Sequence, residues 1–512
     1  MRKFYRGIAV LLLAGMLTGC GAKQEAKSTD TKEKQTIVFA DTQCPTNLDL
    51  AESWNSWYTS RYGITETLFK LDEQLEAQPW LAESCEKKDN LTWEITLKDD
   101  ITFQNGKKMD AQAVLECWNR TMDINARFQE LLFIDSMKAD GNVLTVTTTQ
   151  SVPAFVNSLT DPLTGIIDVS EEDTIAETPV GTGPYKAVSY EVKSEAVVER
   201  YEDYWNGMPK MEEAVFKIIA DTNALTMAQQ KEEVDISVTI PGSSLELFED
   251  EEKYVVDGVA GARGQVIFMN YDNPWIQDLA VRKAISMSID KESYANVLNK
   301  GASVPTNGLY PDFMNFGKEE EAYTFDVEGA KKVLKDAGYE DTNENGIVEK
   351  DGEDVSLRMV TYTTKAELPK YCEQLSSQLK EVGIDLKVET YESVAEQQET
   401  GDFDLMMISF NMVPTGDPLY FANIAFQSEG SSNYGHYFNK KVDELIGQMA
   451  NTYDAEERSE IAKQVQDEIL KDAGFIVVGH SKFVIVMRKD VQGLSANPSE
   501  YYLLDANVSI EK

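Results

Sequence analysis

Histidine, cysteine and basic side chains are scarce in this sequence of 512 residues. It has two histidines, His436 and His480, and five cysteines without a C-x-x-C pair, so the spacing gives no support to a metal cluster. Lysine and arginine number 48 against 88 aspartates and glutamates, a formal charge of −40. Because phosphate binding needs clustered Lys and Arg, this balance argues against a nucleic-acid partner.

Catalytic motifs are missing as well. The sequence has no H-E-x-x-H, G-x-S-x-G, Walker A or complete G-x-G-x-x-G pattern. A Ser-His-Asp triad would have to use one of the two histidines, and neither lies in a recognisable context. Carboxylate pairs arise by chance in so acidic a chain. We therefore expect a protein that is not an enzyme and that carries no cofactor.

Long apolar runs are absent beyond residues 8–14, which follow the basic residues Arg2, Lys3 and Arg6. A spanning helix needs about 20 apolar residues, so residues 1–20 are predicted to be a signal peptide. The signal ends in L-T-G-C, which resembles the lipobox of bacterial lipoproteins and predicts a lipid on Cys20 that holds the protein on the outer face of the cell membrane. The alternative is an ordinary secreted protein. Residues 21–34 are small, polar and charged, which predicts a flexible tether.

The remaining sequence is too long for one ordinary core and predicts two or three lobes. Helices are predicted at 110–122, 326–337 and 368–382, the last two ending before Gly338 and Gly383. Strands at 355–361, 384–390 and 403–410 flank the helix at 368–382, which predicts an α/β lobe with parallel pairing. Further helices are expected near 442–449 and 461–469. Strands at 475–478 and 483–487 would follow, with a turn or hinge at His480.

Twelve short motifs point to one protein family. They are Q-P-W-L-A-E-S at 78–84, L-T-W-E at 91–94, F-Q-N-G at 103–106, G-T-G-P-Y at 181–185, Y-W-N-G at 204–207, E-V-D-I at 233–236, V-R-K-A-I at 281–285, A-K-K-V-L at 330–334, V-G-I at 382–384, G-D-F-D at 401–404, D-P at 417–418 and V-D-E-L at 442–445. In this order the set resembles the family 5 extracellular solute-binding proteins, the peptide- and nickel-binding components of ABC importers. The resemblance covers almost the whole chain.

The resemblance implies an α/β periplasmic-binding-protein-like fold of type II, with two lobes joined by hinge strands. We expect lobe I at 35–265 with an extra N-terminal subdomain at about 70–180, lobe II at 266–479, and a return to lobe I at about 480–512. The implied function is to capture a small extracellular solute between the lobes and deliver it to the permease and ATPase subunits of an importer, as a monomer. A receptor that keeps this fold without transport is an alternative.

A short peptide or peptide-like compound is the first expectation for the solute, and a nickel or other metal chelate is the alternative. Peptide-binding members hold the amino terminus with an acidic residue before the D-P pair, but Val413 or Pro414 stands there, so this clamp is absent. Nickel-binding members tend to place a histidine in the following loop, where His436 is the only candidate nearby; an exposed surface residue is the alternative. The expected solute-binding residues are Trp57, Tyr62, Arg263, Asn270, Phe410, Asn411, Asp417, Tyr420, Asn423 and His436.

Two smaller questions stay open in the sequence. The segment at 341–346 begins like a calcium loop, with Asp341, Asn343 and Asn345 as oxygen donors, but Gly352 stands where a bidentate glutamate is expected. An Asx-rich turn is the alternative. The cysteines other than Cys20, at positions 44, 85, 117 and 372, could form disulfides or remain free thiols.

Overall fold

A computed structural model describes residues 34–318 and 322–511. The predicted signal peptide, the lipidation site Cys20 and the tether up to residue 33 lie outside the described residues. No helix of the described part is long and apolar enough to cross a membrane.

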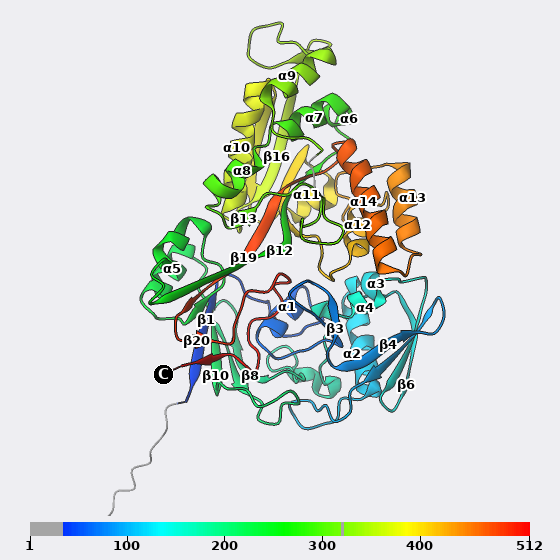
Figure 1. The fold of residues 1–512 in the computed structure, drawn as a ribbon, viewed down its shortest axis with the longest axis vertical. Coiled ribbons are helices and arrows are strands. Elements are labelled where there is room, and N and C mark those ends of the chain that lie inside the picture. The colour runs from blue at the N-terminus through cyan, green and yellow to red at the C-terminus, as the bar shows by residue number, and fades with distance from the viewer. Residues whose placement is uncertain (1–33, 319–321, 512) are drawn as a thin grey trace, which may run out of the picture. The chain divides into compact units, whose positions relative to one another are not determined.

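One long mixed sheet organises residues 35–511 (Figure 1). Its strand order is β17-β16-β18-β12-β19-β11-β1-β10-β9-β8, and β13 pairs with β19 beside this path. The strands are β1 (Thr36–Asp41), β8 (Tyr185–Glu191), β9 (Glu195–Arg200), β10 (Glu213–Ile218), β11 (Ile236–Ser237), β12 (Tyr254–Met269), β13 (Ser303–Val304), β16 (Ser356–Tyr362), β17 (Asp385–Tyr391), β18 (Leu405–Asn411) and β19 (Ile476–Arg488).

We call the half with β1 and β8–β11 lobe I and the half with β16–β18 lobe II. The long strands β12 and β19 pair antiparallel and pass from one half to the other. Their register shifts twice, between Ala260 and Gly264 and between Gln265 and Val266. Such bulges bend a strand pair locally. They lie in the part of the two strands that passes from one lobe to the other. The predicted boundaries 265/266 and 479/480 fall inside these two strands.

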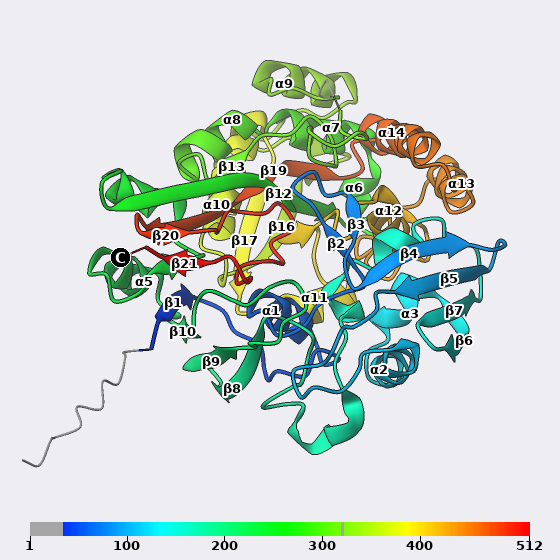
Figure 2. The same ribbon diagram turned by 60° about the horizontal axis from the view of Figure 1, so that its bottom comes forward.

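Lobe I carries a second, four-stranded antiparallel sheet in the order β4-β5-β7-β6, which Figure 2 shows beside α2 and α3. These elements fall inside the range 70–180 expected for an extra subdomain. The other elements of lobe I are α1 (Asn55–Arg61), β2 (Phe69–Leu71), β3 (Ala77–Pro79), β4 (Ala82–Lys87), β5 (Thr92–Leu97), α2 (Ala111–Ile124), α3 (Arg127–Leu132), β6 (Ile134–Asp140), β7 (Val143–Thr148), α4 (Phe155–Ser158), η1 (Pro162–Thr164), η2 (Val169–Thr174), α5 (Thr222–Gln230), η3 (Gly242–Phe248), β20 (Val491–Gln492) and β21 (Ser509–Ile510).

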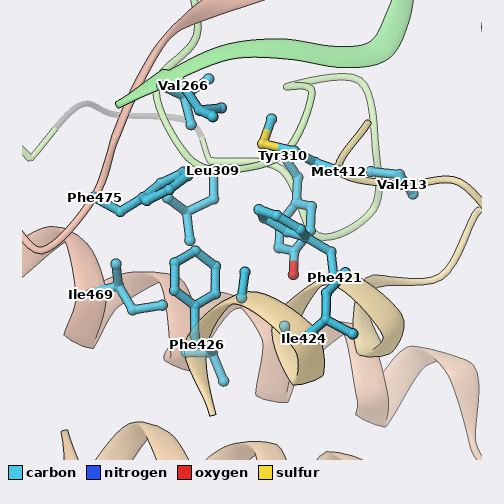
Figure 3. Packing of buried hydrophobic residues seen from close by; sticks show 14 of the residues in the cluster. Val266, Leu309, Tyr310, Met412, Val413, Phe421, Ile424, Phe426, Ile469 and Phe475 are labelled. Atoms are coloured by element: carbon cyan, nitrogen blue, oxygen red, sulfur yellow. The ribbon is translucent and has the colours of Figure 1, made fainter. Parts of the chain in front are cut away.

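Lobe II confirms the predicted α/β pattern. Strand β16 pairs in parallel with both β17 and β18, and α10 connects β16 to β17. The remaining elements of lobe II are α6 (Pro274–Gln277), α7 (Leu279–Met287), α8 (Lys291–Ser293), η4 (Tyr294–Leu298), α9 (Val327–Asp336), β14 (Glu349–Lys350), β15 (Glu353–Asp354), α10 (Glu367–Val382), α11 (Ala395–Thr400), α12 (Pro418–Phe426), α13 (Lys440–Met449) and α14 (Ala455–Lys471). Figure 3 shows part of the core between strand β12 and helices α12 and α14, where Tyr310, Phe421, Phe426 and Phe475 point toward one another.

Helix ends follow the capping signals of the sequence. The side chain of Asp326 accepts a hydrogen bond from the backbone of Gly329 at the start of α9, and Asp110 does the same for Gln112 and Ala113 in α2. Gly383, directly after α10, has φ +92, a conformation that glycine adopts without strain.

The prediction of two strands separated by a turn at His480 is wrong, whereas a hinge at this residue stays a prediction. Strand β19 runs without interruption from Ile476 to Arg488, and His480 is fully buried within it. The polar residues Ser481 and Lys482 interrupt the apolar pattern because this part of the strand faces a cavity between the lobes.

Several motifs that carry the family resemblance converge on one partly buried carboxylate, Glu66. It accepts hydrogen bonds from the indole nitrogens of Trp80 (2.7 Å) and Trp205 (3.1 Å). The hydroxyls of Tyr204 (2.5 Å) and Thr182 (2.9 Å) donate to it as well. Burial raises the pKa of Glu66, although the four donors oppose this shift. The Q-P-W, G-T-G-P-Y and Y-W-N-G motifs are therefore parts of a single structural centre of lobe I.

The glycines of the G-T-G-P-Y motif permit a close backbone approach. A Cβ on Gly181 would lie 1.9 Å from the carbonyl oxygen of Ile64, and one on Gly183 would lie 2.3 Å from that of Gly63. The amide of Gln104, from the F-Q-N-G motif, donates to three backbone carbonyls beside this contact. A side chain at either glycine would push these segments apart.

Contacts outside the cavity also join the lobes. Tyr453, which precedes α14, places its hydroxyl 3.0 Å from Ser151 Oγ and donates to the carbonyl of Asn90 at 2.9 Å. The side-chain amide of Asn157 donates to the carbonyl of Thr415 at 3.1 Å. These bonds hold the four-stranded sheet and its neighbours against lobe II.

Candidate functional site

A cavity of about 780 Å³ lies between the lobes. Its walls come from α1 and the C-terminal segment of lobe I, from the facing parts of β12 and β19, and from β18 and the start of α10 in lobe II. Pockets for small molecules span roughly 300 to 1,000 Å³, so this cavity has room for a compact solute.

Aromatic side chains form much of the wall. Trp54 and Trp57 pack edge to face with ring centroids 5.4 Å apart, and Tyr420 of lobe II faces them from α12. The guanidinium of Arg127 lies 4.8 Å from the Trp54 ring, and its Nε donates to the Tyr420 hydroxyl at 3.2 Å. Since Arg127 also pairs with the fully buried Asp161, it is held rigidly between the two lobes at this wall.

A chain of charged groups forms the wall beside the crossover strands. Nε of Arg263, on β12, lies 3.2 and 3.3 Å from the two carboxylate oxygens of Glu500. Arg61 lies 3.7 Å from the same carboxylate and 3.5 Å from that of Asp41. Burial opposes ionisation of Glu500, but Arg263, Arg61 and Lys365 outweigh it and lower the pKa of this carboxyl. Glu500 is therefore ionised at neutral pH.

Five of the ten residues expected to bind the solute line this cavity. The five are Trp57, Arg263, Phe410, Asn411 and Tyr420. The side-chain amide of Asn411 also lies 3.5 Å from the Tyr501 hydroxyl. They come from α1, β12, β18 and α12, so the fold brings together segments that are far apart in the sequence. Direct contact with a solute stays a prediction for each of them.

Two other expected residues lie in the protein interior. Tyr62 is 3% exposed and packs against Phe216 with ring centroids 4.2 Å apart. The amide of Asn270 donates to the backbone carbonyls of Gly401 and Phe403. Neither lines the cavity, because each side chain is already occupied in holding its lobe together.

Asp417, Asn423 and His436 also lie outside the cavity lining. Asp417 caps α12 and forms a buried ion pair with Arg458 at 2.6 Å, so its carboxylate is a structural group. Asn423 is partly buried on α12. His436 is exposed and its Nδ1 lies 2.8 Å from Asp272, which fits the surface alternative.

The calcium-like segment forms an Asx-rich turn. Asp341 accepts from the backbone amides of Asn345 and Gly346, and Asn343 accepts from Asn345. The side-chain amides of both asparagines donate to Asp354. These bonds fit the turn alternative, and calcium binding stays a prediction. The four cysteines of the described residues are free thiols.

Sequence reasoning missed several groups of the wall, among them Glu500, Arg127, Lys365 and Tyr362. Glu500 and Arg127 carry no local signal, since only folding brings them to the cavity. Tyr362 and Lys365 could have been found, because ligands of α/β sheets bind near the carboxyl ends of parallel strands and β16 ends at Tyr362.

Comparison with known proteins agrees with this geometry. The profile of bacterial extracellular solute-binding proteins, family 5, middle part, matches residues 76–433. The chain belongs to this family. A curated relative, the nickel-binding protein NikA of Staphylococcus aureus, is 26% identical over 516 residues and is covered completely, as is this chain. The glutathione-binding protein GsiB of Escherichia coli K12 is 24% identical, with 84% of this chain and 86% of the relative covered.

Solved structures of the family share the architecture. NikA of S. aureus in complex with Ni(L-His)2 has a TM-score of 0.81 at 26% identity, over 93% of this chain and all of that one. A nickel ABC transporter protein of Bacillus halodurans has a TM-score of 0.79 at 29% identity, with the same coverage. This family 5 protein is therefore a two-lobed extracytoplasmic binding component of an ABC importer, and the predicted fold class is confirmed. Its relatives are transport binding proteins and not enzymes.

Proposed function

We propose that the protein captures a small solute derived from amino acids, with a short peptide or peptide-like compound as the first candidate. The observation that carries this is the wall of the cavity, where aromatic side chains stand beside the basic and acidic side chains of Arg263, Lys365 and Glu500. Aromatic faces bury apolar parts of a ligand, while guanidinium and ammonium groups bind its carboxylates. Phe410, Asn411 and Tyr420 would contact the solute from lobe II, and Trp57 from lobe I.

The amino group of such a solute would be held differently from the clamp expected of peptide-binding members. Val413 is fully buried and Pro414 lines the cavity, so no carboxylate stands at that position. The carboxylates of Glu130, Glu367 and Glu392 line the cavity and are the available partners for an ammonium group. A solute with both charges would thus find a partner for each of them among the lining residues.

A nickel complex of an amino acid is the second candidate, and the full-length similarity to the S. aureus nickel-binding protein favours it. Among the described residues that line the cavity there is no histidine or cysteine. Nickel prefers such nitrogen and sulfur ligands, so the ion would have to arrive with its own ligands. This candidate is also amino-acid-derived and carries carboxylates for Arg263.

Isothermal titration of the purified wild-type protein separates the two candidates. The probes are trialanine, glutathione, Ni²⁺ alone, and Ni²⁺ with two equivalents of L-histidine. Saturable binding of a metal-free peptide supports the first candidate, and binding of the nickel–histidine complex without binding of Ni²⁺ alone supports the second. If none of the four binds, the proposed solute class is wrong.

We also propose that a lipid on Cys20 holds the protein beside its permease as a monomer. The support is the sequence L-T-G-C after a short apolar run. Metabolic labelling with palmitate, followed by cell fractionation, tests this anchor. Cys20→Ala should abolish the label and release the protein from the membrane fraction, whereas unchanged labelling would contradict the proposal.

A further inference from the structure

The cavity contains a carboxylate supplied by the protein itself, at Glu500. This residue stands in the C-terminal segment that follows β19, with φ +63, a left-handed conformation that favours glycine. Its residue exposure is 9% and its neighbours in the wall are Arg263 and Arg61. An ionised carboxylate in such a strained and buried position calls for a reason beyond the folding of the segment.

The backbone of the segment is held without the carboxylate. The Arg61 side chain donates through Nε to the carbonyl of Glu500 at 2.7 Å, and the amide of Leu504 donates to the carbonyl of Arg61 at 3.1 Å. The amide of Ala262, on β12, donates to Pro498 at 3.2 Å. These three bonds hold the segment against α1 and β12, so its position does not depend on the Glu500 carboxylate.

The carboxylate of Glu500 occupies only one edge of Arg263. Both of its oxygens lie near Nε, at 3.2 and 3.3 Å, and the guanidinium lies 5.2 Å from the Trp57 ring. Across residues 34–318 and 322–511, Glu500 is the one ion-pair partner of Arg263. A guanidinium offers five donors in a rigid fork, so the two terminal amino groups stay available to one further carboxylate.

We propose that Glu500 is a specificity-determining residue, which fixes the orientation of Arg263 and limits the negative charge that a solute can bring to this wall. The inference rests on the proposed function and deepens it. With Glu500 in place, its charge offsets part of the positive charge of Arg263 and Arg61, so a second carboxylate of the solute gains little at this wall. Without Glu500, the same wall carries an unbalanced positive charge and prefers more anionic solutes.

Glu500→Gln tests the charge while keeping an acceptor beside Arg263. Trialanine and its C-terminal amide are titrated into the wild type and the variant. The affinity for the free acid, relative to that for the amide, should be roughly tenfold or more higher in the variant than in the wild type. The reason is that a unit charge a few ångströms away changes the energy of the carboxylate by over about 1.4 kcal/mol. A ratio within about twofold of the wild-type value would overturn the proposal.

Asp235→Asn is the matched control for this titration. Asp235 is also buried and pairs with an arginine, Arg488 of β19, at 3.0 Å, but it does not line the cavity. Its substitution should leave the ratio of the two affinities unchanged. A shift as large as that of Glu500→Gln would show that loss of any buried carboxylate suffices, which contradicts a specific role.

A second experiment needs no solute. Glu500→Gly removes the side chain and relieves the left-handed backbone, leaving a space beside Arg263 and Arg61 that acetate can fill. Acetate should raise the melting temperature of this variant more than that of the wild type, relative to chloride at equal ionic strength. An equal response of both proteins would overturn the role of Glu500 as counter-ion. If acetate acts as expected but the wild type binds neither peptide, the peptide candidate fails while the counter-ion role stands.

Discussion

Replacing Glu66 should loosen lobe I in steps that follow the hydrogen bonds lost. The carboxylate accepts from four donors, two at each oxygen, as Trp80 and Tyr204 share Oε1 while Thr182 and Trp205 share Oε2. Glu66→Gln keeps one oxygen as an acceptor for Trp80 and Tyr204 and turns its amide group toward the other two donors, Thr182 and Trp205. The Thr182 hydroxyl can rotate and accept from that amide, but the indole of Trp205 can only donate. One donor is thus left without a partner.

The size of the effect follows from the burial of these donors. A buried donor without a partner costs about 1–3 kcal/mol, and the orphaned Trp205 indole is only partly buried, so Glu66→Gln should lower the free energy of unfolding by about 1 kcal/mol. Glu66→Leu has a similar shape and accepts nothing. Thr182 and Tyr204 are almost fully buried, and the two indoles are partly buried. The leucine variant should therefore lose about 4 kcal/mol, from the two almost fully buried donors alone.

Urea denaturation at pH 7.5, followed by tryptophan fluorescence, measures both variants, because Trp80 and Trp205 report on this centre. Glu83→Gln is the control, since Glu83 is an exposed glutamate of β4 and its substitution should stay within about 0.5 kcal/mol of the wild type. If Gln and Leu at position 66 both stay within that margin, the carboxylate does not hold the three motifs together and the reasoning is refuted.

Three further predictions concern the lobe contacts, a buried ion pair and pH. Tyr453→Phe removes two bonds between the lobes worth about 0.5–1.5 kcal/mol each, so small-angle scattering should show a larger radius of gyration than for the wild type. Asp417→Asn should lower the free energy of unfolding by about 3–5 kcal/mol and leave solute affinity unchanged, because it breaks the buried pair with Arg458 outside the cavity. Burial lowers the pKa of His480 to about 3. Unfolding therefore takes up a proton below about pH 6.5, which lowers the free energy of unfolding as the pH falls. Between neutral pH and about pH 5, urea titrations should show that this free energy falls by about 2 kcal/mol more for the wild type than for His480→Phe.

Each of these predictions has a result that would contradict it. Tyr323→Phe removes a comparable hydroxyl bond, to the carbonyl of Lys471 within lobe II, and should not change the radius of gyration. Equal scattering from both tyrosine variants and the wild type would show that Tyr453 does not hold the lobes together. Loss of solute binding by a stable Asp417→Asn protein would show that Asp417 contributes to the binding site. Parallel pH profiles of the wild type and His480→Phe would mean that His480 is not kept neutral by burial.

Local signals predicted the elements of lobe II well, for reasons that lie within single segments. The helix at 368–382 and its flanking strands appear within two residues of the expected positions, since apolar period and a terminal glycine act over one or two turns. Strand β19 was divided in two because its polar residues suggested a turn. Those residues face a cavity built by other segments, and no local pattern reveals that a strand passes such a cavity.

By itself, the sequence determined the family, the α/β class and the ends of the main helices, because order of motifs, periodicity and caps are properties of neighbouring residues. Only the tertiary structure decided which side chains meet. Asp417 and Tyr62 were expected at the solute and lie in ion-pair and core positions instead. Glu66 and Glu500 drew no attention in the sequence, yet they hold the centre of lobe I and one wall of the cavity. A carboxylate acquires its role from donors that lie far away in the chain, so its function appears only once the chain has folded.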